Sequence, residues 1–309
     1  MSYEGEMLKK LLMPTKKDVE QALLKTLFKH NGTIKEFAAG EDIVNELADV
    51  FSLSEEQRTV ALERIYRKEN RIVKTPLWHR LLYRAADSLA KQQLILRPTE
   101  TFELTQRKEW MLTEDGFDKS LKLLNVAFDA QETLRVKSSE VQKLVNKVKT
   151  TQHPETYDPF EIQSRKKIVS REQSIRSRCF RHVVLESYDC KCSVCGLKIN
   201  SPDNMHWEVE AAHIVPHGKN GKDEIWNGIA LCRLHHWAFD VGWFSLTEDY
   251  RVIVSGKYRN IPDHYGKVGN IDFLTHVLVP NTPIILPEIA SLKPHHSAIQ
   301  WHRENVYYK

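Results

Sequence analysis

Hydrophobic residues in the N-terminal part of the chain recur at helical spacing, in blocks separated by polar breaks. Three amphipathic helices are expected, over 16–30, over 41–51 and after Ser54, because their apolar side chains stand three or four residues apart. A fourth helix is predicted to open at Pro76, since proline suits a helix start. Its inward face would carry Leu77, Leu81, Leu82, Ala85 and Leu89. LILRP and EWMLT then read as two short strands, with a polar turn between them and a last helix after them.

The middle of the chain carries the clearest domain boundary. One narrow helical stripe is expected over 138–150, formed by Val141, Leu144, Val145 and Val148. The segment TQHPETYDPFE that follows has two prolines and no helical period, as a polar break does. We therefore expect a helical module at 1–126, a helical connector and linker at 127–164, and a second domain at 165–309.

The second domain mixes strand and helix patterns. Residues 208–213 predict a short strand, closed by Pro216 and Gly218, and residues 229–231 predict another. From 232 to 240 neither glycine nor proline interrupts, so a helix is expected there. Its buried stripe would consist of Leu234, Trp237 and Ala238. WFSLT and YRVIVSG follow as further strands, and the fold class is predicted to be α+β.

Length and composition limit the class of protein. With 309 residues and 41% hydrophobic residues, the chain can fill two ordinary cores, and its formal net charge of +4 says little about partners. The chain has five cysteines, four of them within 179–195. This odd total favours a reducing cytoplasm over a disulfide framework. No apolar run has the length of a signal peptide core or a membrane span. We therefore expect a soluble, cytoplasmic protein without a membrane partner.

Two short hooks in the second domain have metal-ligand spacing. Cys192 and Cys195 form C-x-x-C, and Cys232 and His235 form C-x-x-H. Each hook can place two donors on one side of a tetrahedral ion, as structural zinc requires. The alternative is that these cysteines are free core residues. Two hooks at this distance favour structural zinc.

His213, Asn227 and His236 stand between and beside these hooks, in the order His, Asn, His. The stretch EAAHIVPH, followed by WNGIALCRLHHWAFD, resembles the HNH nuclease motif, the ββα-metal fold of homing endonucleases, colicin-type DNases and many restriction enzymes. It is most similar to the zinc-stabilised HNH group of bacterial restriction endonucleases. On the expected helix His236 and Asp240 stand at i and i+4, so both can reach one cation, while His235 points toward the cysteines.

The resemblance implies a role for each of these residues. His213 would be the general base, because a neutral imidazole suits proton abstraction near neutral pH. Asn227 would hold the loop and orient that imidazole. His236 and Asp240 would ligate a single catalytic ion, Mg²⁺ or Mn²⁺, with Ni²⁺ or Zn²⁺ also compatible with an imidazole ligand.

One position departs from the family pattern. Many relatives have an Asp or His ligand just before the base, where this chain has Ala212. Glu210, two residues earlier on the same strand face, is the expected substitute. Plainer roles remain as alternatives for the others: His213 as a packed or surface histidine, Asn227 as a turn residue and Asp240 as a helix cap.

The N-terminal module is similar to the winged-helix domain of Mrr-type restriction enzymes, in the order of its elements from WHRLLYRAADSLAKQQ to LTEDGFDKSL. In helix-turn-helix relatives the second helix of the pair enters the major groove. The helix from Pro76 would do so here, and the candidate DNA contacts are Lys74, His79, Arg80, Tyr83 and Arg84. The alternatives are a protein-docking module and an ordinary solvated face.

The most basic stretch is 165–182, with seven Lys or Arg against one Glu. Ile175, Cys179 and Val183 share one helical face, so the basic residues can project from the rest of the helix. Their guanidinium and ammonium groups would then contact DNA phosphates, unless they form only a solvated face. These basic residues are Arg165, Lys166, Lys167, Arg171, Arg176, Arg178 and Arg181.

Together these features predict a metal-dependent DNA endonuclease with a separate recognition module. We expect a restriction enzyme that acts on double-stranded DNA, and one that cuts only modified DNA is conceivable because this chain carries no methyltransferase segment. Since each HNH site cuts one strand, a double-strand break needs a homodimer or two sequential nicks. The alternatives are a DNA-binding regulator with an inactive HNH domain and a structure-specific or RNA nuclease. The structural zinc and a catalytic Mg²⁺ or Mn²⁺ are the expected cofactors.

Overall fold

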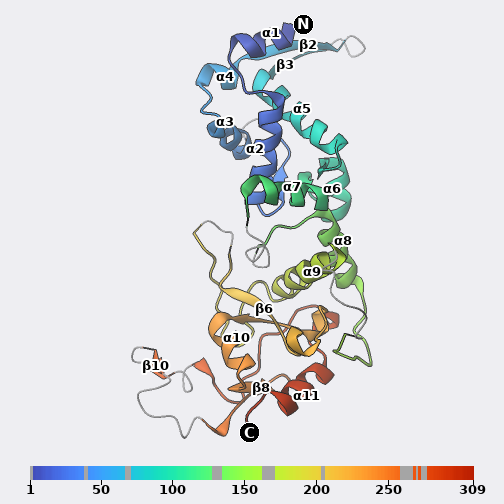
Figure 1. Ribbon diagram of the computed structural model, residues 1–309, viewed down its shortest axis with the longest axis vertical. Coiled ribbons are helices and arrows are strands. Elements are labelled where there is room, and N and C mark those ends of the chain that lie inside the picture. The colour runs from blue at the N-terminus through green and yellow to red at the C-terminus, as the bar shows by residue number, and fades with distance from the viewer. Residues whose placement is uncertain are drawn as a thin grey trace. The chain divides into compact units, whose positions relative to one another are not determined.

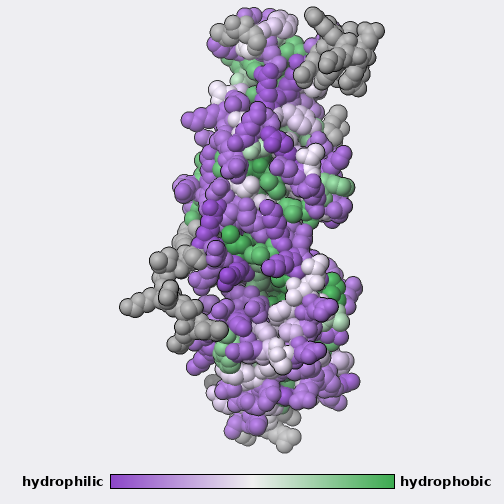
Figure 2. Space-filling view, turned by 90° about the vertical axis from the view of Figure 1, so that its right-hand side faces the viewer, coloured by the Kyte–Doolittle hydropathy of each residue, from purple (hydrophilic) through white to green (hydrophobic). Residues whose placement is uncertain are grey.

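The computed structural model describes residues 3–37, 41–66, 71–126, 134–161, 171–202, 206–257, 267–268, 271–272 and 277–309. The chain divides into two compact units, Met1–Lys143 and Leu144–Lys309, coloured from blue to green and from green to red in Figure 1. Each unit has a hydrophobic core of its own. On the face shown in Figure 2, hydrophilic residues predominate and hydrophobic residues form only small patches. Among the described residues, no helix combines the length and the apolar character needed to span a bilayer.

The first unit is mostly helical, as expected. Its helices are α1 (Tyr3–Lys10), α2 (Lys16–Lys29), α3 (Asp42–Val50), α4 (Glu55–Thr59), α5 (Leu77–Lys91), α6 (Pro98–Thr105) and α7 (Glu114–Leu124). Three short antiparallel strands form a sheet in the order β1 (Thr33–Lys35), β5 (Glu109–Leu112) and β4 (Ile95–Leu96). Between α4 and α5, a separate hairpin pairs β2 (Ala61–Tyr66) with β3 (Arg71–Pro76).

Local sequence signals explain where α2 and α4 begin. Thr15 and Ser54 cap these helices, because each side chain accepts a hydrogen bond from the backbone N–H three residues later. Asp18 and Gln57 return a bond to the cap backbone, which completes a capping box at both sites. The apolar faces of α2 and α5 then pack together in the core.

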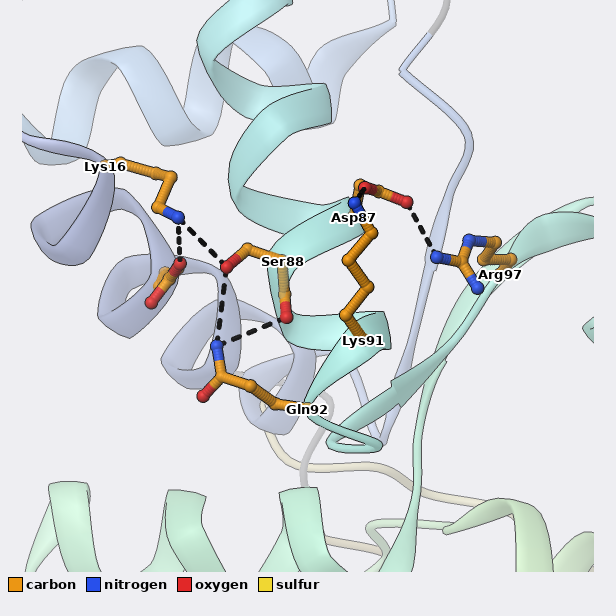
Figure 3. A network of polar contacts seen from close by, with 7 residues as sticks. Lys16, Asp87, Ser88, Lys91, Gln92 and Arg97 are labelled. Atoms are coloured by element: carbon orange, nitrogen blue, oxygen red, sulfur yellow. Dashed lines mark hydrogen bonds and ion pairs between the residues drawn. The ribbon is translucent and has the colours of Figure 1, made fainter.

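A polar network borders this packing (Figure 3). Lys16 Nζ lies 3.1 Å from Ser88 Oγ, which links the start of α2 to α5. Asp87 accepts from Lys91 at 2.8 Å and from Arg97 at 2.7 Å, and these two cations lower the pKa of the Asp87 carboxyl. Because the Asp87 side chain is 44% exposed, such pairs contribute about 1 kcal/mol or less, and the apolar core dominates the stability of the unit.

Two features of the first unit were not expected from the sequence. The presumed polar turn after LILRP contains α6, which starts at Pro98, and the Glu100 carboxylate accepts from the Arg97 N–H at 2.8 Å. The β2–β3 hairpin was not predicted either. Its strands carry their apolar residues in adjacent pairs next to charged residues, so neither helical spacing nor strict alternation marks them.

The second unit is built around a hairpin and three helices. Its helices are α9 (Arg171–Ser187), α10 (Arg233–Asp240) and α11 (His296–Asn305), and α8 (Ser139–Thr150) spans the boundary of the units. The hairpin pairs β6 (Val209–His213) with β7 (Gly228–Cys232), and a second hairpin pairs β8 (Phe244–Leu246) with β9 (Val252–Val254). Short 3₁₀ turns are η3 (His217–Lys219), η4 (Ile225–Asn227) and η7 (Ala290–Leu292). A small pair, β10 (Lys267–Val268) and β11 (Ile271–Asp272), completes the described elements.

The segment after α8, expected as a polar break, is attached to the second unit by backbone hydrogen bonds. Lys222 N–H donates to Pro159 O at 2.9 Å, and Glu161 N–H donates to Asn220 O at 2.7 Å. Ser297, at the start of α11, donates through Oγ to Tyr157 O at 2.8 Å. Residues 151–161 therefore lie along the β6–β7 loop. The remainder of the predicted connector, 127–133 and 162–164, lies outside the described residues.

The buried face of α10 differs from the expected one. Leu234 and Trp237 are 39% and 51% exposed, whereas His235, Ala238 and Phe239 are buried. The prediction was therefore right for Ala238 and wrong for Leu234 and Trp237, whose places in the buried face are taken by His235 and Phe239. The reason is that His235 must face inward to reach the cysteines, and this orientation carries Ala238 and Phe239 into the core.

His302 on α11 gives the second unit a predictable dependence on pH. The ring is buried, stacks on Phe239 with centroids 3.6 Å apart, donates through Nε2 to Phe239 O, and accepts at Nδ1 from Ser245 Oγ. Burial lowers the pKa of His302 from 6.5 to about 4, although the Phe239 carbonyl acts in the opposite direction. Between these values the unfolded chain binds a proton that the folded chain does not.

Lowering the pH from 6.5 to 4 should therefore destabilise the second unit by up to about 3 kcal/mol through this residue. Denaturant unfolding at a series of pH values would measure the slope, and His302→Gln is the comparison because it cannot titrate. Equal slopes for both proteins in this range would contradict the assignment.

Candidate active site

Four sulfur and nitrogen donors converge beside α10. Cys192 Sγ lies 3.7 Å from His235 Nδ1, Cys232 Sγ lies 3.0 Å from the same nitrogen, and Cys195 Sγ lies 4.0 Å from Cys232 Sγ. Zinc bonds of about 2.3 Å to sulfur and 2.0–2.1 Å to nitrogen put neighbouring tetrahedral ligands about 3.5–3.8 Å apart. His235 also bonds through Nε2 to Val277 O at 2.9 Å, which fixes the ring with Nδ1 toward the sulfurs. The cluster is thus consistent with zinc.

The electrostatics of this cluster also fit a cation. Hydrogen bonds from Cys195 and Cys232 lower the pKa of the Cys192 thiol, and the Cys192 thiolate in turn raises the pKa of Cys232. Burial opposes protonation of His235, but its hydrogen bonds to Cys192 and Cys195 raise its pKa to about 10. Without a metal ion, protons on Cys232 and His235 balance the negative charge of the Cys192 thiolate, and a bound cation would replace them.

His213, the predicted base, lies at the end of β6 opposite Gly228 of β7. Its Nε2 is 2.8 Å from Asp223 Oδ1, and its ring stacks on Phe180 of α9 with centroids 4.2 Å apart and an interplanar angle of 18°. Because a carboxylate can only accept, Nε2 donates, and Nδ1 is left as the unprotonated nitrogen of the neutral ring. A Cβ on Gly228 would lie 2.8 Å from the Phe180 ring, so glycine allows this close packing.

Asn227 is fully buried and closes the loop between the two strands. Its Oδ1 accepts from Val215 N–H at 2.8 Å, and its Nδ2 donates to Val215 O and Lys222 O, both at 3.1 Å. The amide therefore clamps both arms of the loop that carries Asp223. It acts on His213 through the position of Asp223, while the described hydrogen bonds of its own side chain go to the backbone.

His236, Glu210 and Asp240 meet on the exposed side of α10. His236 Nδ1 lies 3.0 Å from Glu210 Oε2, and His236 Nε2 lies 3.5 Å from Asp240 Oδ2. The two carboxylates thus approach different nitrogens of the ring, so the three donors do not converge on one point. Ala212, where relatives have a ligand, is buried in the core.

The ionisable side chains around His236 shift one another's pKa values. The hydrogen bond from His236, followed by the charges of His236 and Arg233, lowers the pKa of Glu210 against the effect of burial. Burial raises the pKa of Asp240, although His236 and His213 act the other way, which places His213 within electrostatic range of Asp240. For His236, burial is outweighed by Glu210 and Asp240, so its pKa is raised. Arg233, whose Nε lies 3.1 Å from Glu210 Oε1, offsets part of the negative charge of the two carboxylates.

Sequence reasoning missed Asp223 and Phe180. Asp223 lies in the loop between β6 and β7, where neither hydrophobic periodicity nor metal-ligand spacing identifies it as a site residue. Phe180 lies on α9, which packs on β6 and β7, and only its place on a buried face hinted at a packing role.

The predicted contacts on and beside α5 are largely engaged within the first unit. Arg80 donates to Leu62 O at 2.6 Å, Tyr83 donates to Phe37 O at 3.0 Å, and Arg84 lies 2.8 Å from Glu4 of α1. Lys74 on β3 lies 3.3 Å from Glu63 and is 71% exposed. His79 is half-buried, and burial lowers its pKa.

The basic residues of α9 divide into two groups. Arg171 and Arg176 are exposed, and Arg181 is half-buried. Arg178 is only 2% exposed, which corrects the expectation that it projects to solvent. Arg165, Lys166 and Lys167 lie outside the described residues.

The β6–β7 hairpin has α10 packed against both strands, one imidazole at the end of the first strand, and a second imidazole on the helix between a carboxylate of β6 and one of α10. Residues 192–247 match the family of HNH endonucleases, so this part of the chain is an HNH endonuclease domain and its chemistry is that of a nuclease hydrolase. Phe180 lies outside the matched residues.

Comparison of structures finds similarity to the modification-dependent TagI restriction endonuclease, with a TM-score of 0.32 and 22% sequence identity. The similarity covers 45% of this chain and 44% of that protein, so the chain spans less than half of its length. No curated protein matches the sequence.

Proposed function

We propose that the chain is a metal-dependent restriction endonuclease that hydrolyses phosphodiester bonds in double-stranded DNA. The observation that carries this proposal is the pair of His213 and Asp223, which holds one imidazole nitrogen protonated and leaves the other basic. It stands in an HNH domain, within electrostatic range of the group of His236 and Asp240.

The catalytic ion would be held through His236 together with Glu210 or Asp240. One imidazole and one carboxylate suffice for Mg²⁺ or Mn²⁺, because such ions keep several water ligands. When bound, the ion would offset the negative charge that develops on the phosphate. The structural zinc would be held by the separate group of Cys192, Cys195, Cys232 and His235.

In this proposal His213 takes a proton from the attacking water at Nδ1. The Asp223 carboxylate holds Nε2–H in place and balances the positive charge that the ring acquires. Phe180 keeps the ring plane fixed through stacking, and Asn227 keeps the loop of Asp223 closed. Asp223, Phe180 and Asn227 are thus positioning residues, and His213 is the catalytic one.

Recognition of DNA is assigned to the first unit. Helices α2, α3 and α5 with a small sheet in the order β1–β5–β4 fit the winged helix that the sequence resembles. Lys74 and its partner Glu63 are 71% and 57% exposed, and an ion pair this exposed is worth about 1 kcal/mol or less, so a phosphate can displace Glu63. Arg84 is 56% exposed and offers its guanidinium beside Glu4. Arg80 and Tyr83 would serve to hold the β2–β3 hairpin and the β1 end of the unit. Arg171, Arg176 and Arg181 on α9 would hold phosphates near the nuclease domain.

Supercoiled plasmid from methylation-proficient and methylation-deficient hosts, incubated with Mg²⁺ or Mn²⁺, tests the proposal. We expect nicked and linear products, and cleavage of only one plasmid source if modified DNA is required. Linear product at the earliest times would support a homodimer, whereas nicked circles first would indicate sequential cuts. Absence of cleavage with either metal and either DNA would favour a DNA-binding regulator. Preference for RNA or branched DNA would favour a structure-specific nuclease.

Replacing Asp223 by asparagine should lower the cleavage rate by about 10- to 100-fold, with little change in the substrate concentration for half-maximal rate. The amide can donate to Nε2 and thereby stabilise the tautomer with its proton on Nδ1. Asp223→Glu, which retains the acceptor, should recover part of the rate. A wild-type rate in Asp223→Asn would exclude the positioning role.

A further inference from the structure

We infer that His213, His217 and Asp223 form a second metal site, which takes a borderline divalent cation such as Zn²⁺ and inhibits the nuclease by capturing its base. The inhibition rests on the proposed function of His213. The binding of the ion rests on the geometry of the three side chains alone.

The three side chains each offer one ligand atom, and these atoms lie within 4.8 Å of one another. His213 Nε2 and Asp223 Oδ1 are already 2.8 Å apart, and the rings of His213 and His217 have centroids 6.0 Å apart. Zinc bonds of about 2.0–2.2 Å place two ligands of one ion about 3.3 Å apart. Small rotations close the difference, and exposed His217 has room for them.

The fold keeps these donors close. The loop of residues 214–227 is clamped by Asn227, and its two arms approach so tightly that a Cβ on Gly221 would lie 1.9 Å from Val215 O. Gly221 N–H bonds to Pro216 O at 3.1 Å, which fixes the turn that carries His217. The loop therefore loses little conformational entropy when an ion binds.

The donor set selects the kind of ion. Two imidazoles and one carboxylate leave a fourth position for water, which is a common arrangement for zinc bound by three protein ligands. The pair proposed for the catalytic ion, His236 with Glu210 or Asp240, offers one imidazole and one carboxylate and suits Mg²⁺ or Mn²⁺ better. The two groups should therefore take different ions from a mixture.

Capture of His213 would remove its basic nitrogen. In the metal-free pair the proton is on Nε2, where Asp223 accepts it, and Nδ1 is free to take a proton from water. An ion on Nε2 displaces that proton, and the neutral ring then carries its proton on Nδ1. The proton count of the ring is unchanged, but the nitrogen that serves as the base is blocked.

The experiment uses the full-length protein carrying its structural zinc. Plasmid nicking in Mg²⁺ is measured while Zn²⁺ is added, and zinc per chain is measured after dialysis against buffered zinc. His217→Ala removes the ligand that has no part in the proposed catalysis, and His206→Ala, another exposed histidine of the same unit, is the matched control. Wild type and His206→Ala should bind a second zinc and lose at least about tenfold in rate. His217→Ala should keep the wild-type rate in Mg²⁺, retain a single zinc, and need at least about tenfold more zinc for inhibition.

Equal zinc sensitivity of His217→Ala and wild type would overturn the inference, as would an equal zinc content of the two proteins. Loss of activity of His217→Ala in Mg²⁺ alone would also overturn it, because His217 would then belong to the catalytic site. If the chain cleaves no nucleic acid at all, the proposed function fails. The zinc count of wild type against His217→Ala still decides the metal site in that case.

Discussion

Alanine at position 213 should reduce DNA strand cleavage about a thousandfold while leaving the protein folded and DNA binding unchanged. General-base catalysis contributes about 10²- to 10⁴-fold, and His213, whose imidazole contacts Asp223 and Phe180, is the base in our proposal. The side chain is only 23% exposed, so its removal opens a small space beside Phe180 without exposing the core.

Single-turnover nicking of supercoiled plasmid in Mg²⁺ is the measurement for His213→Ala. Imidazole added to the buffer should restore part of the rate, because it can enter the space and accept the proton. The zinc content of the Cys192 site should be the same as in wild type. A variant that cuts at the normal rate would remove His213 as the base, and a variant that loses its zinc would show a structural effect.

Substitution of Cys195 by serine should unfold the second unit. Cys195 is one of the four proposed zinc ligands, and a structural zinc contributes about 10–16 kcal/mol of apparent binding free energy, much of which is folding free energy. Loss of the ion leaves buried Cys192, Cys232 and His235 to share protons in a space that disfavours charge. The lost zinc-binding free energy is as large as the usual net stability of a domain, about 5–15 kcal/mol, so the unit should no longer fold.

Zinc per chain and thermal unfolding followed by circular dichroism would test this second prediction. Cys190→Ser is the matched control, since Cys190 is close in sequence but outside the ligand group. Only Cys195→Ser should lose zinc and the transition of the second unit, and a strong chelator should reproduce the effect in wild type. The first unit, with its separate core, should unfold as before. A cooperative, zinc-free second unit in Cys195→Ser would contradict the prediction.

The elements with strong local signals could be predicted from the sequence. Thr15 and Ser54 mark helix starts that the structure contains, and the C-x-x-C and C-x-x-H hooks bring their side chains together because each spacing is short. The buried face of α10 could not be predicted from hydrophobicity, because a metal-ligand candidate, His235, sets the rotation of the helix. The contacts of His235 therefore set which face of α10 is buried, and the apolar residues of the helix do not.

The candidate site was predicted only where residue type and spacing carry the chemistry. His213, Asn227 and His236 are recognisable in that way, but Asp223 is brought to His213 by a loop whose shape depends on the amide of Asn227. Phe180 arrives from a helix distant in sequence. Contacts of this kind depend on tertiary packing, and no local pattern encodes them.

The attachment of residues 151–161 to the β6–β7 loop bears on how the two units can be separated or recombined. A fusion made at the proline-rich segment would remove the backbone hydrogen-bond partners of Asn220 and Lys222, which lie next to Asp223 in the sequence. Exchange of the first unit is better made upstream of that segment, so that the second unit retains these hydrogen bonds.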